Sequence, residues 1–365
     1  MKAAFFNSTF YMGQAANGWP TPRTQYSDER ARYSLQEALD QFELADQAGF
    51  DWVTLAEHHY GPVGLTPNPM VMAAAMAQVV KRAKIAILGS NIPMLNPIRI
   101  AEEYAMLDTL TQGRVVAGLI RGTPNEYVTY NVNPAESRAR FEEALLLIKH
   151  IWTEPQPFGW QGRYFQYRSI CIWPRPVQQP HPQIFMSGSS PESAAFAAEA
   201  KVSLGIAVST VQLAKASFGI YRTRAEELGW TPSKDDCLYR LSFHVAESDE
   251  QALKDVEESH NHPQRLSPIM MNRALERTVA GTGYYGSDVT KQSARNTRSA
   301  GLNDRIDSGQ LIIGSPDTVV HQIERIGEEL GVGVLDLVPA FQIGQPTRRS
   351  IELFGREVLP RVRNV

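Results

Sequence analysis

Cysteine is scarce in this sequence, with only Cys171 and Cys237 among 365 residues. Two cysteines so far apart form neither a disulfide framework nor the paired spacing of a zinc site, so we expect two reduced thiols. An excess of charge is also absent, because 36 Lys and Arg stand against 39 Asp and Glu, for a formal net charge of −3. A chain with this balance lacks the basic surface that nucleic acid or an anionic membrane would select, and neither partner is expected.

Long hydrophobic runs are missing as well. The most apolar stretch, residues 69–80, is closely flanked by polar residues and is too short to cross a bilayer, which favours a buried helix. The first residues contain no long apolar segment and no convincing cleavage site, and they indicate a first strand. We therefore expect a cytoplasmic location.

What the sequence does contain is a regular alternation of short β-branched runs and amphipathic segments, typical of βα units around a parallel sheet. About eight such alternations occur, the count that a closed (β/α)8 TIM barrel needs. We predict one barrel domain over residues 1–365, because α/β barrels of this size commonly form a single unit. An open doubly wound sheet is the alternative, and it is disfavoured because no strand is followed by a glycine-rich dinucleotide fingerprint.

The expected elements can be given as residue ranges. We predict strands over 2–6, 51–56, 84–89, 114–120, 182–186, 203–208, 237–245 and 334–338. We predict helices over 33–48, 68–82, 98–111, 137–152, 191–200, 211–228, 251–259, 316–330 and 349–358.

Two segments interrupt the alternation. Residues 158–172 carry aromatic and glycine residues that indicate a hairpin insertion. Residues 260–309 are rich in Gly, Ser and Arg and show no clear period. A stretch of that length is either a solvated basic loop or a mobile lid insertion that closes over a bound cofactor, and we predict the lid.

Polar residues gather where the predicted strands end, whereas the strand interiors are apolar. In a (β/α)8 barrel the active site is built at the C-terminal ends of the strands. The second to fifth strands are followed by Glu57-His58-His59-Tyr60, Gly89-Ser90-Asn91, Arg121-Gly122 and Ser187-Gly188-Ser189-Ser190.

The fifth strand exit has the features of an anion site. Ser190 and Pro191 are typical of the N-cap and first position of a helix, whose free N–H groups and dipole attract anions. Arg121, at a neighbouring exit, can pair with phosphate oxygens through two hydrogen bonds. Glu192 favours the alternative of a plain capped helix, since its carboxylate would compete with a phosphate. The predicted phosphate-binding residues are Arg121, Gly188, Ser189, Ser190 and Ser193.

The adjacent His58 and His59 suggest a metal site, but the geometry of a strand disfavours it. Neighbouring residues on an extended strand point to opposite faces, so the two imidazoles do not easily share one ion, and we expect no metal. One histidine should face the barrel mouth, where it could donate a hydrogen bond or transfer a proton. The strand pattern leaves open which of the two this is.

Several segments in a fixed order resemble the luciferase-like flavin-dependent monooxygenases, over nearly the whole chain. They are AEHHY at 56–60, LNPIRIAEEYAMLDTLTQGRVVAGLIRG at 95–122, residues 136–152, PRPVQQPHPQIFMSGSSPES at 174–193 and IIGSPDTVVHQI at 312–323. The resemblance implies a (β/α)8 barrel that binds FMN at its C-terminal mouth.

The resemblance also implies roles for individual residues. His58 should be the catalytic residue near the isoalloxazine ring. The stretch of Gly89, Ser90 and Asn91 should lie against the flavin, where the family often has a non-proline cis peptide. Arg121 and the turn around Ser189 match the family's phosphate-binding positions, although luciferase has an acidic residue where this chain has Ser189.

In such a family a separate flavin reductase supplies reduced FMN as a co-substrate. The resemblance therefore implies a monooxygenase that uses O₂ to oxygenate a small organic substrate. Phe10, Tyr11, Trp19 and Phe341 suggest that this substrate is apolar. Two alternatives remain: a deazaflavin (F420)-dependent oxidoreductase that transfers hydride, and a non-catalytic flavin-binding protein. The family commonly dimerises through the helices at 69–80 and 98–110, so we expect a homodimer.

Overall fold

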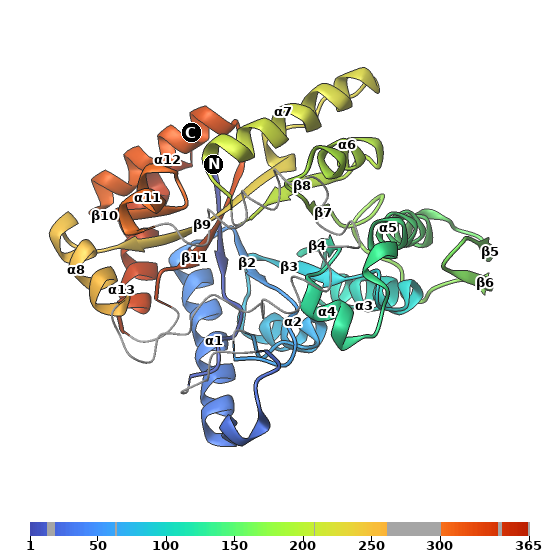
Figure 1. The fold of residues 1–365 in the computed structure, drawn as a ribbon, viewed down its shortest axis with the longest axis horizontal. Helices are drawn as coiled ribbons and strands as arrows, with labels where there is room; N and C mark the ends of the chain where they lie inside the picture. Colours follow the sequence, from blue (N-terminus) through green and yellow to red (C-terminus); the bar gives the residue numbers. More distant parts are fainter. Residues whose placement is uncertain (13–18, 63, 208, 261–300, 342–344, 364–365) are drawn as a thin grey trace.

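A closed barrel of eight parallel strands forms the centre of the structure (Figure 1). The computed structural model describes residues 1–12, 19–62, 64–207, 209–260, 301–341 and 345–363. Each barrel strand pairs in parallel with the next, and the last pairs with the first, which confirms the predicted (β/α)8 barrel. In order around the barrel the strands are β1 (Lys2–Phe6), β2 (Trp52–Leu55), β3 (Lys84–Asn91), β4 (Val115–Ile120), β7 (Ile184–Ser187), β8 (Ser203–Ile206), β9 (Cys237–Val245) and β11 (Val334–Pro339).

Helices cover the outside of this barrel. They are α1 (Asp28–Ala48), α2 (Pro69–Val79), α3 (Pro97–Leu110), α4 (Pro124–Thr129), α5 (Ser137–Thr153), α6 (Pro191–Glu199), α7 (Val211–Glu227), α8 (Asp249–His260), α11 (Leu302–Asp307), α12 (Pro316–Leu330), α13 (Gln345–Leu353) and α14 (Leu359–Val362), with a π-helical turn at Phe354–Val358. Short 3-10 turns lie at Arg23–Gln25, Pro134–Glu136 and Lys234–Asp236. None of the helices in the described ranges is both long enough and apolar enough to cross a membrane.

Helices α2, α3, α6 and α12 begin in the same way, with a side-chain cap followed by proline. The cap oxygen accepts a backbone N–H from the first turn, and proline fits there because its missing N–H would have no partner in the helix. The caps are Asn68, Asn96, Ser190 and Ser315. This local signal explains why the predicted starts of these helices lie within one residue of the observed ones.

The hydrophobic core has an outer and an inner part. The larger part fills the space between the sheet and the surrounding helices. The inner part lies inside the barrel, where the rings of Trp52 and Phe185 meet edge to face with centroids 5.7 Å apart. Leu88 and Leu238 belong to the same inner cluster. These side chains close the barrel below its mouth and form the floor on which a site can be built.

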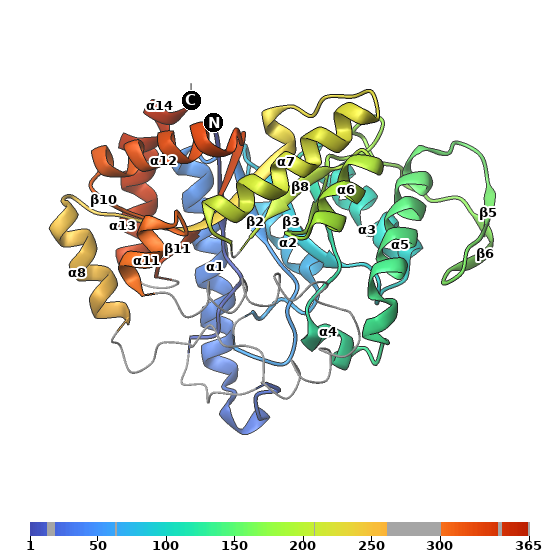
Figure 2. The same ribbon diagram turned by 45° about the horizontal axis from the view of Figure 1, so that its top comes forward.

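The ends of the barrel differ in what they carry. The N-terminal ammonium donates to the carbonyl of Val362 at 3.1 Å, so the two chain termini meet at the amino ends of the strands. The carboxyl ends point the opposite way, toward α4 (Figures 1 and 2). The predicted hairpin is confirmed as β5 (Phe158–Gln161) and β6 (Gln166–Ile170), which extend from the side of the molecule beyond α5 (Figure 2).

Some predicted boundaries are wrong. α1 begins at Asp28 rather than at residue 33, because Ser27 caps it and Asp28 and Glu29 suit the positive end of its dipole. The last helix begins at Gln345 rather than at residue 349. The short elements α4 and β10 (Leu311–Gly314) were not predicted, and β10 pairs with β9 beyond the part that pairs with β8.

The predicted lid insertion over 260–309 falls mostly on residues 261–300, which lie outside the described residues. Its final part is not structureless as expected, because Leu302–Asp307 form the helix α11. Leu302 and Ile306 pack beside Leu311 and Ile313 of β10. This end of the stretch therefore belongs to the layer of helices around the barrel. The assignment of residues 1–365 to a single domain remains a prediction.

Candidate active site

Two histidine–glutamate pairs lie at the end of β2. The Nε2 atom of His59 is 3.0 Å from Oε1 of Glu57, and both side chains are buried, at 6% and 1% exposed. The Nδ1 atom of His58 is 3.6 Å from Oε1 of Glu126 on α4, and the His58 side chain is 25% exposed. The adjacent imidazoles thus contact different carboxylates, although β2 ends at Leu55, before both of them. His58 has the more exposed side chain of the two, at 25% against 6%.

Glu126 is held as an anion beside His58. Its Oε2 atom accepts the backbone N–H of Thr123 at 2.8 Å and also accepts the Thr123 hydroxyl. Burial by itself raises the pKa of Glu126, but the hydrogen bond and charge of His58 and the donors of Thr123 outweigh it and leave that pKa below its ordinary value. Because Nδ1 of His58 faces this carboxylate, Nε2 is the ring nitrogen left for a ligand.

The buried pair ties β2 to β3. The second oxygen of Glu57 accepts the backbone N–H of Asn91 at 3.1 Å, and the backbone N–H of Glu57 donates to the carbonyl of Gly89. Tyr130 of the loop after α4 lies 3.5 Å from Nε2 of His59, and burial together with the charge of Glu57 raises the pKa of Tyr130 to about 12. This pair therefore positions the end of β3.

The end of β3 carries the predicted flavin-facing stretch. The Leu88–Gly89 peptide bond is cis, and a Cβ on Gly89 would lie 2.5 Å from the carbonyl oxygen of Gly118, so only glycine fits there. The Ser90 hydroxyl lies 3.1 Å from the hydroxyl of Tyr104 on α3, so this side chain faces the helices rather than the mouth. The Asn91 side chain is buried, and within the described residues its amide has no hydrogen-bond partner.

The exit of β7 forms the predicted helix start. Ser190 caps α6 by accepting the backbone N–H of Ser193 at 3.2 Å, and its hydroxyl also donates to Oγ of Ser193. A Cβ on Gly188 would lie 2.3 Å from Cβ of Ser193, so the turn closes tightly over the first turn of the helix. The Ser189 residue is exposed, and its carbonyl accepts the Ser217 hydroxyl at 3.0 Å. The predicted residues 188–190 and 193 are therefore together in one turn.

Two arginines lie near this helix start. The pKa of Glu192, in the first turn of α6, is lowered by its own backbone N–H, by the Ser190 hydroxyl, and by the charges of Arg138 and Arg121. Burial and the neighbouring charge of Arg121 lower the pKa of Arg138, on α5. Two guanidinium groups and a helix N-terminus thus favour negative charge here, and the exposed Glu192 carboxylate accepts its own backbone N–H.

Sequence reasoning missed Arg138. It stands in the first turn of α5, at the positive end of the helix dipole, where an arginine is unfavourable without another purpose. An arginine at this position could have indicated an anion site. The apolar periodicity that predicts the helix does not indicate it.

A pocket lies deeper in the barrel, between β3, β4, β7, β8 and β9. It holds about 340 Å³ of space, counting its opening to solvent. Its walls are mainly apolar, formed by Leu88, Ile120, Phe185, Met186, Ile206 and Leu238. Ser187, the last residue of β7, also lines it and is followed directly by the turn at residues 188–190.

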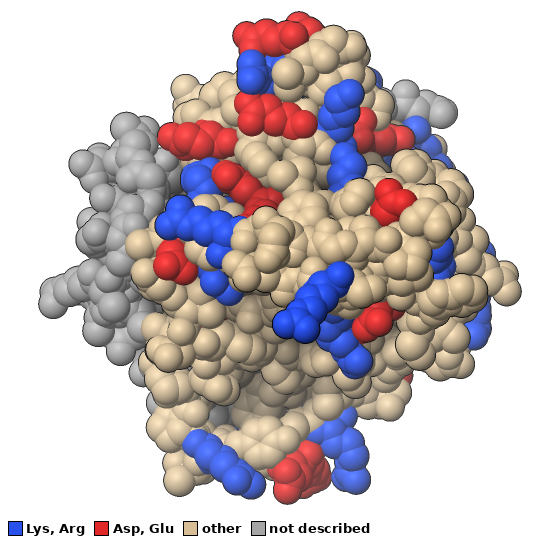
Figure 3. All heavy atoms as spheres, turned by 90° about the vertical axis from the view of Figure 1, so that its right-hand side faces the viewer, with Lys and Arg blue, Asp and Glu red and all other residues tan. Residues whose placement is uncertain are grey.

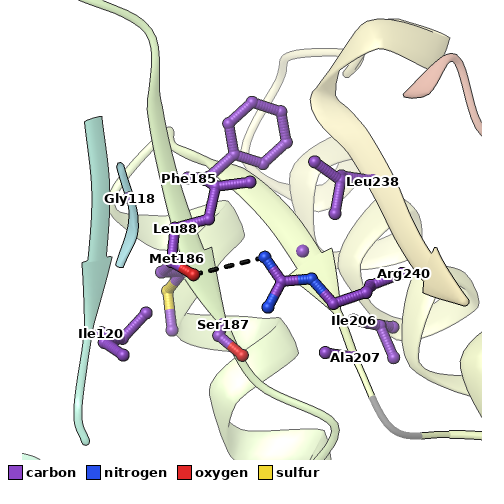
Figure 4. Close-up of a pocket in the computed structure, with 11 residues that line it drawn as sticks. Leu88, Gly118, Ile120, Phe185, Met186, Ser187, Ile206, Ala207, Leu238 and Arg240 are labelled. Carbon is purple, nitrogen blue, oxygen red and sulfur yellow. Dashed lines mark hydrogen bonds between the residues drawn. The ribbon is translucent and has the colours of Figure 1, made fainter. Parts of the chain in front are cut away.

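Among the described residues that line this pocket, Arg240 of β9 is the charged one (Figure 4). Its Nε atom donates to Oδ2 of Asp336 on β11 at 2.6 Å, and Nη2 donates to the carbonyl of Leu88 at 3.3 Å. Asp336 is fully buried, and its other oxygen accepts the Thr54 hydroxyl at 2.7 Å. The expectation that strand interiors are apolar is wrong here, because β9 carries Arg240 and β11 carries Asp336. These two side chains pair only when the barrel closes.

The aromatic residues predicted to line the mouth have other contacts. Trp19 is buried and donates to the carbonyl of His59 at 2.7 Å, and Tyr11 is buried with its hydroxyl 3.3 Å from the carbonyl of Gln25. Phe341 packs edge to face on His244, with ring centroids 4.6 Å apart. These three residues pack the loops above the strands and do not line the inner pocket.

The comparison with known families assigns the class of protein. Residues 16–333 match the sequence model of the luciferase-like monooxygenases. The chain therefore belongs to the luciferase-like monooxygenase family, as the resemblance of its motifs predicts.

Three similar proteins are each identical to the chain at 28% or less of the aligned residues. The chain is 28% identical over 342 residues to 4-hydroxyprotoasukamycin monooxygenase from Streptomyces nodosus subsp. asukaensis, which covers 90% of this chain and 87% of that protein. Its fold is similar to that of the oxygenating constituent of 3,6-diketocamphane monooxygenase from Pseudomonas putida in complex with FMN, with 22% identity, a TM-score of 0.77 and coverage of 99% and 98%. An F420-dependent secondary alcohol dehydrogenase is also similar in fold, with 19% identity, a TM-score of 0.73 and 99% coverage of both chains.

Proposed function

We propose that this protein is a monooxygenase that takes reduced FMN as a co-substrate and uses O₂ to oxygenate a small organic substrate. The observation that supports this proposal is an arrangement at one end of the barrel. A mainly apolar pocket is lined by Ser187, the last residue of β7, which precedes the turn into the capped start of α6, and His58 follows β2 at the same end. A cofactor with a phosphate at one end and a planar ring at the other would match these two parts of the site.

The residues fit FMN at both ends. Arg121, Arg138 and the backbone N–H groups at the start of α6 would hold the phosphate, displacing the exposed Glu192 carboxylate. The walls formed by Leu88, Ile120 and the residues listed above for the pocket would hold the ring and exclude water from it. Gly89 lets β3 approach the backbone of Gly118 on β4 closely, and its neighbour Leu88 lines the pocket. Reduced FMN, when bound, supplies the electrons with which O₂ is activated.

His58 would hold or move a proton at Nε2. The Glu126 carboxylate fixes its Nδ1 side, so the imidazole presents Nε2 toward the mouth in a defined orientation. Replacing His58 by Ala should lower turnover by about 10²–10⁴-fold, the usual contribution of a positioned acid or base. Binding of FMN should change little, because the phosphate and ring contacts remain.

The test is a reaction with isotopically labelled O₂, in which a flavin reductase supplies reduced FMN and a panel of small apolar ketones, aldehydes and alkenes is offered. The proposal expects one labelled oxygen atom in a product, its loss in His58→Ala, and its retention in His321→Ala, an exposed histidine on α12. Consumption of reduced FMN without any labelled product would favour a non-catalytic flavin-binding protein.

A flavin reductase is the expected partner. The similar structure from Pseudomonas putida is described as an oxygenating constituent, which implies a separate source of reduced flavin for that protein. We propose the same arrangement for the present chain. We also propose a cytoplasmic location, where reduced flavin is produced.

We also infer a homodimer. Val71 of α2, Met106 and Leu110 of α3 are 69%, 57% and 61% exposed, although a helix that only covers the barrel has no need of apolar residues on its outer face. Figure 3 shows the side of the molecule that carries α5 and the hairpin, where charged side chains of both signs lie among larger uncharged areas. Met106→Glu with Leu110→Glu should sediment as a monomer. Leu253→Glu on α8, a less exposed leucine of another surface, should sediment like the wild type.

A second candidate is hydride transfer with the deazaflavin F420, supported by the fold of the F420-dependent alcohol dehydrogenase. Anaerobic titration of the protein with reduced FMN and with reduced F420 distinguishes the two functions. Binding of F420 but not FMN would replace the monooxygenase proposal with the dehydrogenase.

A further inference from the structure

Arg240 is the inner counterpart of the arginines at the phosphate position, and its surroundings fix it in one orientation. Nε is bound to Asp336, Nη2 to the carbonyl of Leu88, and the guanidinium carbon lies 3.8 Å from the ring centroid of Phe6. A planar guanidinium held on three sides cannot swing away to solvent as a surface arginine would. Its position in the pocket is therefore part of the site.

The hydrogen-bond capacity of Arg240 is not filled by these contacts. A guanidinium carries five N–H groups. Among the described residues, Asp336 and Leu88 are its hydrogen-bond acceptors, which leaves three N–H groups without a protein acceptor. The side chain is 17% exposed, and the surface that it reaches is the pocket (Figure 4). In a pocket that opens to solvent these N–H groups can bind water, and a ligand that expels the water has to supply the acceptors itself.

We propose that Arg240 binds the pyrimidine edge of the flavin ring, where the carbonyl oxygens and ring nitrogens accept hydrogen bonds, and thereby favours the reduced anionic form. This inference rests on the proposed function, because it takes FMN as the occupant of the pocket. The other edge of the ring is a methylated benzene without acceptors, which would leave the three N–H groups unpaired. In the proposed orientation, the acceptor edge therefore faces Arg240 on β9.

The charge of Arg240 gives this contact a direction. Reduced flavin carries its negative charge on the pyrimidine part of the ring, whereas the oxidised ring is neutral. A guanidinium beside that part stabilises the reduced form more than the oxidised form. Asp336 opposes this effect, since its carboxylate is bound to the same guanidinium at 2.6 Å. The pair therefore sets the preference of the site for reduced FMN, the form that the proposed reaction consumes.

The test measures the dissociation constants of oxidised and reduced FMN, under anaerobic conditions, for the wild type and two variants. Asp336→Asn keeps Arg240 and removes the opposing charge, so the ratio of oxidised to reduced dissociation constants should rise about tenfold. Arg240→Met with Asp336→Asn removes both charges without leaving a buried carboxylate unpaired, and the ratio should fall about tenfold. Each tenfold change corresponds to about 30 mV in the midpoint potential of a two-electron couple.

Two further variants control for general damage to the site. Arg121→Ala, at the phosphate end, should weaken both oxidation states alike and leave their ratio unchanged. Arg356→Met removes an exposed surface arginine and should change neither constant.

The outcomes separate this inference from the proposed function. If the two variants at the inner end retain the wild-type ratio, or shift it in the same direction, Arg240 has a structural role only and the inference is wrong. If substrate binding but neither flavin constant depends on Arg240, its acceptor is the substrate, which also overturns the inference. Failure of the wild type to bind FMN in either state would overturn the proposed function itself.

Discussion

The candidate site has an outer end at the start of α6 and an inner end in the barrel pocket. Both ends contain arginine, but they are built differently. At the outer end, Arg121 and Arg138 come from a strand exit and a helix start and act beside an exposed helix N-terminus. At the inner end, Arg240 lies within a barrel strand and shares its charge with the fully buried Asp336. A charge at the rim can change ligand affinity without changing the fold. A charge inside the barrel is coupled to folding, because its partner has no access to water.

The largest effect that separates the two ends is on stability. Arg240→Met alone should lower the free energy of unfolding by about 3–5 kcal/mol, because it leaves the Asp336 carboxylate buried with only the Thr54 hydroxyl. Adding Asp336→Asn should restore most of the loss, since no charge is then buried. Denaturant unfolding of the single and double variants measures this difference. Equal stability of the two would mean that the inner pair does not contribute to folding as described.

The next largest effect should appear in the affinity for FMN and not in the free energy of unfolding. Arg121→Ala should weaken FMN binding by about 1.5–3 kcal/mol, the usual value of hydrogen bonds to charged groups, or roughly 10–100-fold. Its free energy of unfolding should stay within about 0.5 kcal/mol of the wild type. Calorimetric titration with FMN and with riboflavin provides the comparison, because riboflavin has no phosphate. An equal loss of affinity for both ligands would place Arg121 away from the phosphate.

A smaller effect tests the shape of the outer end. Gly188→Ala would place a Cβ 2.3 Å from Cβ of Ser193, so the start of α6 would have to shift, at a cost of about 1–3 kcal/mol. Gly219→Ala is the matched control, since nothing lies within 4 Å of its Cβ position and alanine favours a helix. Thermal unfolding should show a lower midpoint for the first variant only. A wild-type midpoint for Gly188→Ala would show that the turn can relax.

The smallest effect concerns Glu126, the carboxylate on α4 that pairs with His58. The pKa of Glu126 is below its ordinary value in the folded protein, so the unfolded chain binds this proton more readily. The resulting stabilisation is present above the unfolded pKa of about 4.3 and is lost as the pH falls through the lower folded pKa. Glu126→Gln lacks this contribution, so its stability should depend less steeply on acid pH. Identical slopes for both proteins between about pH 3 and 6 would contradict the assignment.

The difference between the two ends also explains what could be predicted from the sequence. The outer end depends on local signals: a strand exit, a capping serine and a proline place residues 188–193 without knowledge of the rest of the chain. The separate partners of the two histidines do not follow from strand alternation, because β2 ends at Leu55. The strand Cys237–Val245 was predicted with both ends correct.

The inner end depends on contacts between residues far apart in sequence. Arg240 and Asp336 are 96 residues apart, and only closure of the barrel brings β9 beside β11. Their charges inside apolar strands were a visible signal, but neither residue indicates its partner. The partner of His58 was missed for a related reason, since Glu126 lies on a six-residue helix that is too short to show a periodic pattern.

The central claim is that the site receives reduced FMN and uses it with O₂. The most direct test is stopped-flow absorbance of the protein with reduced FMN, mixed with aerated buffer. The account predicts that reoxidation is slower than in free solution and passes through a spectrum distinct from those of reduced and oxidised FMN. Reoxidation at the rate of free reduced FMN, with no distinct spectrum, would contradict it.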